Sequence, residues 1–131
     1  FDLVSPEKLL LSEDVEMVVV PGAEGDFGVL PGHSPLISTL RTGVIAVYEN
    51  DAVNRRIFVS GGFAEVTPER CTVLADEAVA LGSANRSDVE DRVKADREAL
   101  ESSADDDKEN AATKLAVSEA LLLALDTAGQ A

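Results

Sequence analysis

The stretch Val20–Gly43, VPGAEGDFGVLPGHSPLISTLRTG, decides how this chain is interpreted. It is dense in glycine and proline and carries the single histidine of the chain, His33. A phosphate-binding Walker loop needs a lysine to reach the phosphates, and this stretch contains none. Its glycines follow a G-x-x-G-x-x-G spacing over residues 22–28, which is not the G-x-G-x-x-G of a dinucleotide site. Tight backbone corners explain them better and predict a rigid surface loop, which loses little entropy when a partner docks on it.

Short valine-rich runs lie on both sides of this stretch, up to about residue 81, and turn signals separate them. Proline fixes φ in these turns, glycine permits positive φ, and Asn or Asp bonds the local backbone. Many short strands at turn spacings of about 8–12 residues are typical of an antiparallel β-sandwich or barrel. The predicted strands lie within residues 1–4, 15–20, 35–40, 44–49, 55–61, 63–66 and 71–80.

The composition changes after Gly82, where proline disappears and Ala, Glu, Asp and Leu dominate. We expect a first helix capped by Ser87 or Asp88, with acidic residues in its first turn where the helix dipole favours them. The polar run 101–110 predicts a linker or turn, and residues 111–129 predict a second helix with Gly129 as its C-terminal cap. The sequence thus predicts a β-sandwich domain at 1–83 and an antiparallel two-helix hairpin at 84–131.

The charge and composition exclude several functions. The formal net charge of −14 repels phosphate backbones and anionic lipid surfaces, so we expect no nucleic-acid partner. The few aromatic residues and the absence of Trp argue against a base-stacking or sugar-binding platform. The longest apolar runs fall far below the roughly 20 residues that span a bilayer, so no direct membrane insertion is expected. The chain begins at Phe1 rather than Met, and we expect a few residues to precede it.

Catalytic and metal sites are not visible in the sequence. His33 with Asp26 or Ser34 nearby lacks the activated nucleophile and orienting acid of a triad. Cys71 is the only cysteine, which excludes an intrachain disulfide and two-cysteine metal sites, and its apolar strand predicts a buried, inert thiol. We therefore predict no catalytic residue, no metal and no cofactor.

Two long motifs identify a family. VVVPGAEGDFGVLPGHSPLISTLRTGVI and, downstream, FVSGGFAEVTPERCTVLADEAV closely resemble the epsilon subunit of F-type ATP synthases, called delta in mitochondria. The resemblance runs from residue 1 to about 80. It implies a sandwich of about ten strands, a C-terminal helical hairpin, and a non-catalytic subunit of the rotor's central stalk that helps couple proton flow to ATP synthesis.

The resemblance also implies the partners and their contacts. The sandwich is expected to bind the gamma subunit and sit on the c-ring, with the hairpin reaching the alpha and beta subunits. Glu24, Asp26 and His33 are carried over as contact candidates, with Pro31 and Gly32 as their scaffold. Arg41, at the end of the same stretch, completes the predicted contact set. The implied location is peripheral, as part of the F1 sector on the cytoplasmic face of the bacterial inner membrane, and the matrix or stroma of an organelle stays open as an alternative.

The C-terminal half departs from the family pattern in two ways. Where many bacterial members carry an Asp-x-x-Arg-Ala signature for ATP, this sequence has Glu90 and Val93, and losing the Arg removes a bidentate donor. We expect weak or no ATP binding. Residues 86–131 hold six basic and twelve acidic side chains, so an approach to an acidic loop of the beta subunit would set like charge against like. The hairpin is therefore expected to regulate ATP hydrolysis weakly at most.

Two alternatives from other classes stay open. A free-standing acidic β-sandwich binding module would have no affinity for gamma. A small hydrolase using His33 with Asp26 would lose turnover in His33→Ala while keeping its associations.

Overall fold

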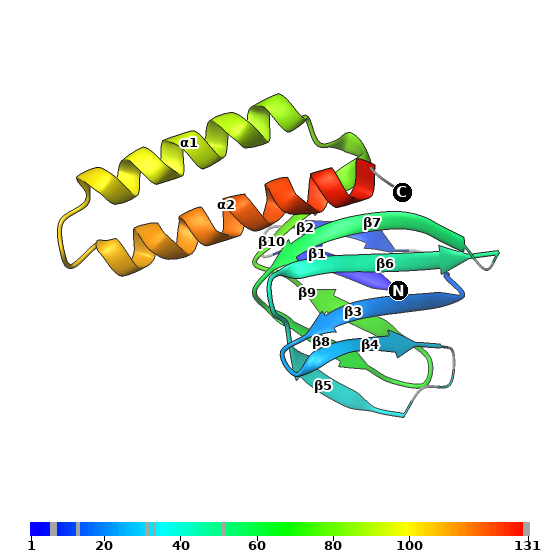
Figure 1. The fold of residues 1–131 in the computed structure, drawn as a ribbon. Helices are drawn as coiled ribbons and strands as arrows, with labels where there is room; N and C mark the ends of the chain where they lie inside the picture. The colour runs from blue at the N-terminus through cyan, green and yellow to red at the C-terminus, as the bar shows by residue number, and fades with distance from the viewer. Residues whose placement is uncertain (6–7, 13, 31, 33, 51, 130–131) are drawn as a thin grey trace. The chain divides into compact units, whose positions relative to one another are not determined.

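A computed structural model describes all residues except 6–7, 13, 31, 33, 51 and 130–131 (Figure 1). The chain divides into two compact units, residues 1–82 and 83–131, next to the boundary expected from composition. Each unit is described by itself. No helix within the described ranges is long and apolar enough to cross a membrane.

The first unit is a sandwich, and its described residues form ten strands in two five-stranded sheets. The order in the first sheet is β2 (Lys8–Ser12), β1 (Asp2–Ser5), β9 (Cys71–Leu74), β8 (Phe63–Val66) and β5 (Leu36–Thr39). The order in the second sheet is β10 (Glu77–Ala80), β7 (Ala52–Ser60), β6 (Gly43–Glu49), β3 (Met17–Gly22) and β4 (Gly25–Val29). All the strand pairs are antiparallel except β1 with β9, which run parallel.

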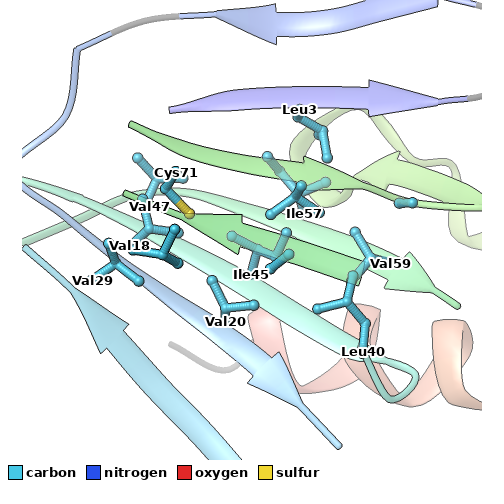
Figure 2. Packing of buried hydrophobic residues seen from close by; sticks show 14 residues of the cluster. Leu3, Val18, Val20, Val29, Leu40, Ile45, Val47, Ile57, Val59 and Cys71 are labelled. Carbon is cyan, nitrogen blue, oxygen red and sulfur yellow. The ribbon is translucent and has the colours of Figure 1, made fainter. Parts of the chain in front are cut away.

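The core lies between the two sheets and follows the two-residue period of the strands. Val18 and Val20 of β3 and Ile45 and Val47 of β6 are each at most 1% exposed. Alternate residues of β8 and β9 face them from the first sheet, and Figure 2 shows the side chains filling the space between. Each fully buried Val or Ile contributes about 1.5–3 kcal/mol, so these alternating positions determine which face of each strand is buried.

The structure has strands where the sequence predicted turns. β4 covers residues 25–29, which lie between the predicted strands. It forms because pairing of Val18 with Val29 and Val20 with Phe27 outweighs the weak β propensity of glycine. β2 was also missed; it pairs with β1. The predicted strand at 71–80 divides into β9 and β10, which belong to different sheets.

The second unit is a hairpin of α1 (Arg86–Ser102) and α2 (Lys108–Gly129), which pack against each other. The predicted cap at Ser87 or Asp88 is wrong: Asn85 is the N-cap, and its side chain accepts hydrogen bonds from the backbone N–H groups of both residues. Asn85 takes the role because its extended backbone places the amide oxygen over those free donors.

The helical hairpin has a shorter turn than the sequence predicted. α1 continues through Ser102 and α2 already begins at Lys108, so the break covers only residues 103–107 instead of 101–110. The Ser103 backbone N–H and hydroxyl both donate to the Leu100 carbonyl, which closes the first helix. Gly129 is the last residue of α2, and the predicted cap geometry beyond it lies outside the described residues.

Candidate partner-binding surface

The acidic turn predicted as a contact site is the tip of the β3–β4 hairpin, formed by Ala23 and Glu24. The favoured two-residue hairpin turns need positive φ at one or both of these positions, and neither residue has it. Gly25 adopts the unusual conformation instead, with φ of +142°. The tip is exposed at every position from 23 to 26.

The segment Thr39–Arg41 holds this tip through its backbone. The Ala23 N–H donates to the Thr39 carbonyl at 2.9 Å, and the Arg41 N–H donates to the Pro21 carbonyl at 3.0 Å. An isolated bridge between Gly22 and Leu40 lies between these two bonds. The tip is therefore fixed to residues far along the chain as well as by its own hairpin.

The Arg41 side chain adds two further contacts to the same tip. Its Nη1 donates to the Gly22 carbonyl at 2.6 Å, and its Nη2 forms an ion pair with the Asp26 carboxylate. The two side chains are 44% and 58% exposed, so the ion pair contributes at most about 1 kcal/mol. Its main effect is on geometry, because a guanidinium that contacts two groups at once fixes their relative position.

The structure separates the predicted contact residues into two groups. Glu24, Asp26 and Arg41 lie together at the Gly22 end of β3. Gly32 follows β4 at the opposite end, where its N–H donates to the Pro68 carbonyl at 2.9 Å. The four residue steps of β4 correspond to roughly 13 Å between the two ends. Pro31 and His33, which were also predicted, lie outside the described residues.

An apolar patch that the sequence analysis missed lies on the outer face of the first sheet. We define the outer-face patch as Ile37, Phe63 and Leu74. Ile37 is 71% exposed and Phe63 is 42% exposed, whereas Ala64 and Val66, the alternate residues of β8, are buried in the core. Phe63 pairs in register with Leu74 on β9. The alternation in FAEV could have revealed Phe63, because successive side chains on a strand point to opposite faces and Ala64 and Val66 take the core face.

Cys71 is buried in the core, as predicted (Figure 2). Desolvation raises the pKa of its thiol from 9.0 to about 11, and the charge of Asp2 acts in the same direction. A thiol that stays protonated is a poor nucleophile. No group of three or more metal-ligating side chains gathers anywhere in the described part of the chain.

The sequence of the whole sandwich matches a known family. Residues 1–81 match the family model described as "ATP synthase, Delta/Epsilon chain, beta-sandwich domain". The chain belongs to this family. The family named from the two sequence motifs is thereby confirmed, as is the ten-stranded sandwich followed by two helices.

Curated relatives in this family extend over nearly the full chain. The ATP synthase epsilon chain of Rhodospirillum rubrum is 57% identical over 125 residues, covering 95% of this chain and 93% of the relative. That of Paramagnetospirillum magneticum is 51% identical over 126 residues, covering 95% of each. The similarity therefore includes the helical hairpin, beyond the part that the family model matches.

Two solved structures share the fold. A chain of the Euglena gracilis mitochondrial ATP synthase, in a structure titled OSCP/F1/c-ring, aligns with a TM-score of 0.77 at 24% identity. The alignment covers 95% of this chain and 79% of the Euglena chain. A chain of the Tetrahymena thermophila mitochondrial ATP synthase, in a structure titled central stalk/c-ring, aligns with a TM-score of 0.60 at 14% identity, with 95% and 93% covered.

Glu90 and Val93, the positions predicted to replace the nucleotide signature, both lie in α1. Glu90 accepts a hydrogen bond from Arg86 Nε at 2.9 Å, so its carboxylate is engaged within the helix. Val93, at the position expected for the signature Arg, is 6% exposed. A buried valine offers no donor for a phosphate or an adenine. Weak or no ATP binding stays a prediction.

Proposed function

We propose that this chain is the epsilon subunit of a proton-translocating F-type ATP synthase. The subunit belongs to the rotor, links gamma to the c-ring and performs no catalysis of its own. The observation that carries the proposal is the match to an epsilon chain at 57% identity over 95% of the sequence. The location that follows is peripheral, on the cytoplasmic face of a bacterial inner membrane.

The outer-face patch is the surface that we assign to gamma. Exposed isoleucine and phenylalanine on a sheet face lose unfavourable contact with water when a partner covers them. β5 is also the edge of its sheet within the described residues, so its outward side chains are not crowded by a further strand. Exposed large apolar residues are common at protein interfaces, with charged residues at the rim, and Glu65 lies beside Ile37 in register.

The helical hairpin is assigned at most a weak role in regulating ATP hydrolysis. Several of its basic side chains are already paired with its own carboxylates. Arg86 pairs with Asp126 and Arg97 with Glu119, both between the two helices, and Lys108 pairs with Asp105. Separating the helices toward an acidic loop would require the two pairs between them to break, while the excess of carboxylates would repel the loop.

The test uses F1 depleted of this subunit, to which the full chain or a form ending at residue 85 is added. Because residues 1–82 form a compact unit of their own, both forms should associate. The rate of ATP hydrolysis should be equal with either form if the helical hairpin does not inhibit it. Association of neither form would contradict the rotor assignment, and slower hydrolysis with the full chain alone would contradict the weak regulatory role.

The surface assigned to gamma is tested by Ile37→Asp in the full chain. A carboxylate at the centre of an apolar interface must lose its hydration, so association with gamma should weaken by at least roughly tenfold. Leu123→Asp is the matched control, since Leu123 is 67% exposed on the helical hairpin. Equal effects of the two substitutions would reject the outer-face patch as the gamma surface.

A further inference from the structure

The tip of the β3–β4 hairpin carries two carboxylates, and their surroundings differ. The Asp26 carboxylate forms an ion pair with Arg41. Glu24 is exposed and forms no hydrogen bond or ion pair with any residue that the structure describes. The two acidic residues, equivalent as contact candidates in the sequence, therefore have different capacities to bind a basic partner.

We propose that Arg41 is a positioning residue, which holds the Gly22–Asp26 tip and neutralises Asp26 so that Glu24 is the acidic group presented to the partner. The inference rests on the proposed function, in which the subunit links gamma to the c-ring, and it assigns the exposed acidic tip to the contact with the c-ring. The chemistry that it specifies is a basic side chain on the partner, placed to contact Glu24. Asp26 and Arg41 act on the partner only through the position of the tip.

The geometry supports this division of roles. Arg41 reaches the tip from the β5–β6 connection and contacts Gly22, before the turn, and Asp26, after it. A single planar guanidinium thus ties both sides of the turn, which a lysine ammonium cannot do with the same fixed directions. Its own N–H bonds Pro21 at 3.0 Å, so the base of the side chain is anchored as well. A charge on a tip held in this way loses little entropy when it meets its partner.

The experiment measures the affinity of the full chain for the gamma–c-ring complex of a synthase lacking this subunit, at low and at moderate salt. Glu24→Gln and Asp26→Asn are charge-matched, because each removes one negative charge from the same tip. Long-range attraction to a basic partner therefore changes equally in both, and the difference between them reports the local contact. Glu69→Gln is the distant control, because it removes one negative charge from the β8–β9 turn. This turn lies near Val18 and Val29, at the end of the sandwich opposite the tip.

We expect Glu24→Gln to weaken binding by roughly three- to tenfold and to flatten the dependence on salt, because a direct charge contact is lost. Asp26→Asn should weaken binding clearly less, and Glu69→Gln should have the smallest effect. An effect of Asp26→Asn as large as or larger than that of Glu24→Gln overturns the proposal.

Arg41→Ala tests the positioning role, and Arg56→Ala is its control because Arg56 is an exposed arginine on β7. Both changes make the chain more acidic, which favours a basic partner equally at long range. Arg41→Ala should nevertheless bind several-fold more weakly than Arg56→Ala, with Arg41→Lys between them. In the double variant, Arg41→Ala should weaken binding no further than Glu24→Gln alone does, because Arg41 acts through Glu24. A full additional loss in the double variant overturns the proposal.

Amide hydrogen exchange provides a readout that does not depend on the partner. The Ala23 N–H, which bonds Thr39, should exchange faster in Arg41→Ala while the amides of the sandwich core keep their rates. Unchanged exchange at Ala23 would overturn the positioning role. If the unaltered chain itself fails to bind the gamma–c-ring complex, the proposed function fails, and the inference fails with it. Binding of the unaltered chain with the wrong order of variants removes the inference alone.

Discussion

Replacing Gly62 with alanine should strongly destabilise the sandwich. Gly62 has φ of +96°, a conformation that costs an L-residue about 1–2 kcal/mol. A Cβ at this position would collide with the Leu74 carbonyl oxygen, and it would lie 2.9 Å from the carbonyl carbon and 3.0 Å from the Ala75 Cα. These are backbone atoms, so no rotamer change relieves the overlap, and overpacking of this kind costs a further 1–3 kcal/mol or so. The sum is about 2–5 kcal/mol.

Two other glycines separate the terms of this estimate. Gly25 also has positive φ, but a Cβ there would meet no atom within 4 Å, so Gly25→Ala should cost only the conformational part, about 1–2 kcal/mol. Gly82 has neither positive φ nor a neighbour within 4 Å. Gly82→Ala should therefore change stability by no more than about 0.5 kcal/mol.

The assay is thermal unfolding of the full chain followed by tyrosine fluorescence. The chain has one Tyr and no Trp, and Tyr48 lies in β6, so this signal reports the sandwich and not the helical hairpin. A domain of this size loses about 4–8 °C in Tm for each kcal/mol, so Gly62→Ala should melt at least about 8 °C lower. A Tm close to that of Gly82→Ala would refute the reasoning. Equal losses for Gly62→Ala and Gly25→Ala would show that the backbone collision adds nothing.

Three further substitutions test the core, the thiol and the helical hairpin. Ile45→Ala removes a fully buried side chain from the centre of the sandwich and should lower the free energy of unfolding by about 2–5 kcal/mol, measured by urea titration. Because burial raises the pKa of Cys71 to about 11, the folded thiol stays protonated at pH values where the unfolded thiol ionises. The contribution of Cys71 to stability should thus be complete below pH 9 and be lost as the pH rises toward 11. Cys71→Val, which cannot ionise, should lack that part of the alkaline loss when melting is followed from pH 8 to 11. In α1, the Asp96 Oδ2 is buried and has no hydrogen bond with any described residue, while Arg92 Nε lies 3.9 Å away. Asp96→Leu should leave the helical signal at 222 nm as stable as in the unaltered chain or up to about 1 kcal/mol more stable. A clear loss of stability relative to the unaltered chain would show that the buried carboxylate stabilises the helical hairpin.

Much of this architecture could be predicted from local sequence. The alternation of valine and isoleucine with polar residues predicts strands and their buried faces, because successive side chains on a strand point to opposite sides. The loss of proline and the rise of alanine and leucine after residue 82 predict helices. The failure of each phosphate, triad and metal pattern is also a local property, since those chemistries need particular residues at particular spacings.

The tertiary structure decided what depends on residues far apart in the chain. The run at 71–80 divides because Ala75 bonds Val4 in the first sheet, while Glu77 already pairs with Ser60 in the second. Pairing of this kind is non-local, and no window of sequence contains both partners.

The candidate surface shows the same division. Sequence alone predicted tight, exposed turns with acidic side chains within residues 20–43, because proline fixes φ and glycine permits positive φ. The resemblance placed Glu24, Asp26, Pro31, Gly32, His33 and Arg41 in one contact set. Only the fold decided that Gly32 lies at the opposite end of β4, and that Arg41 turns back over 15 residues to pair with Asp26. The sheet registers bring those two charges together, and they leave Glu24 exposed at the tip.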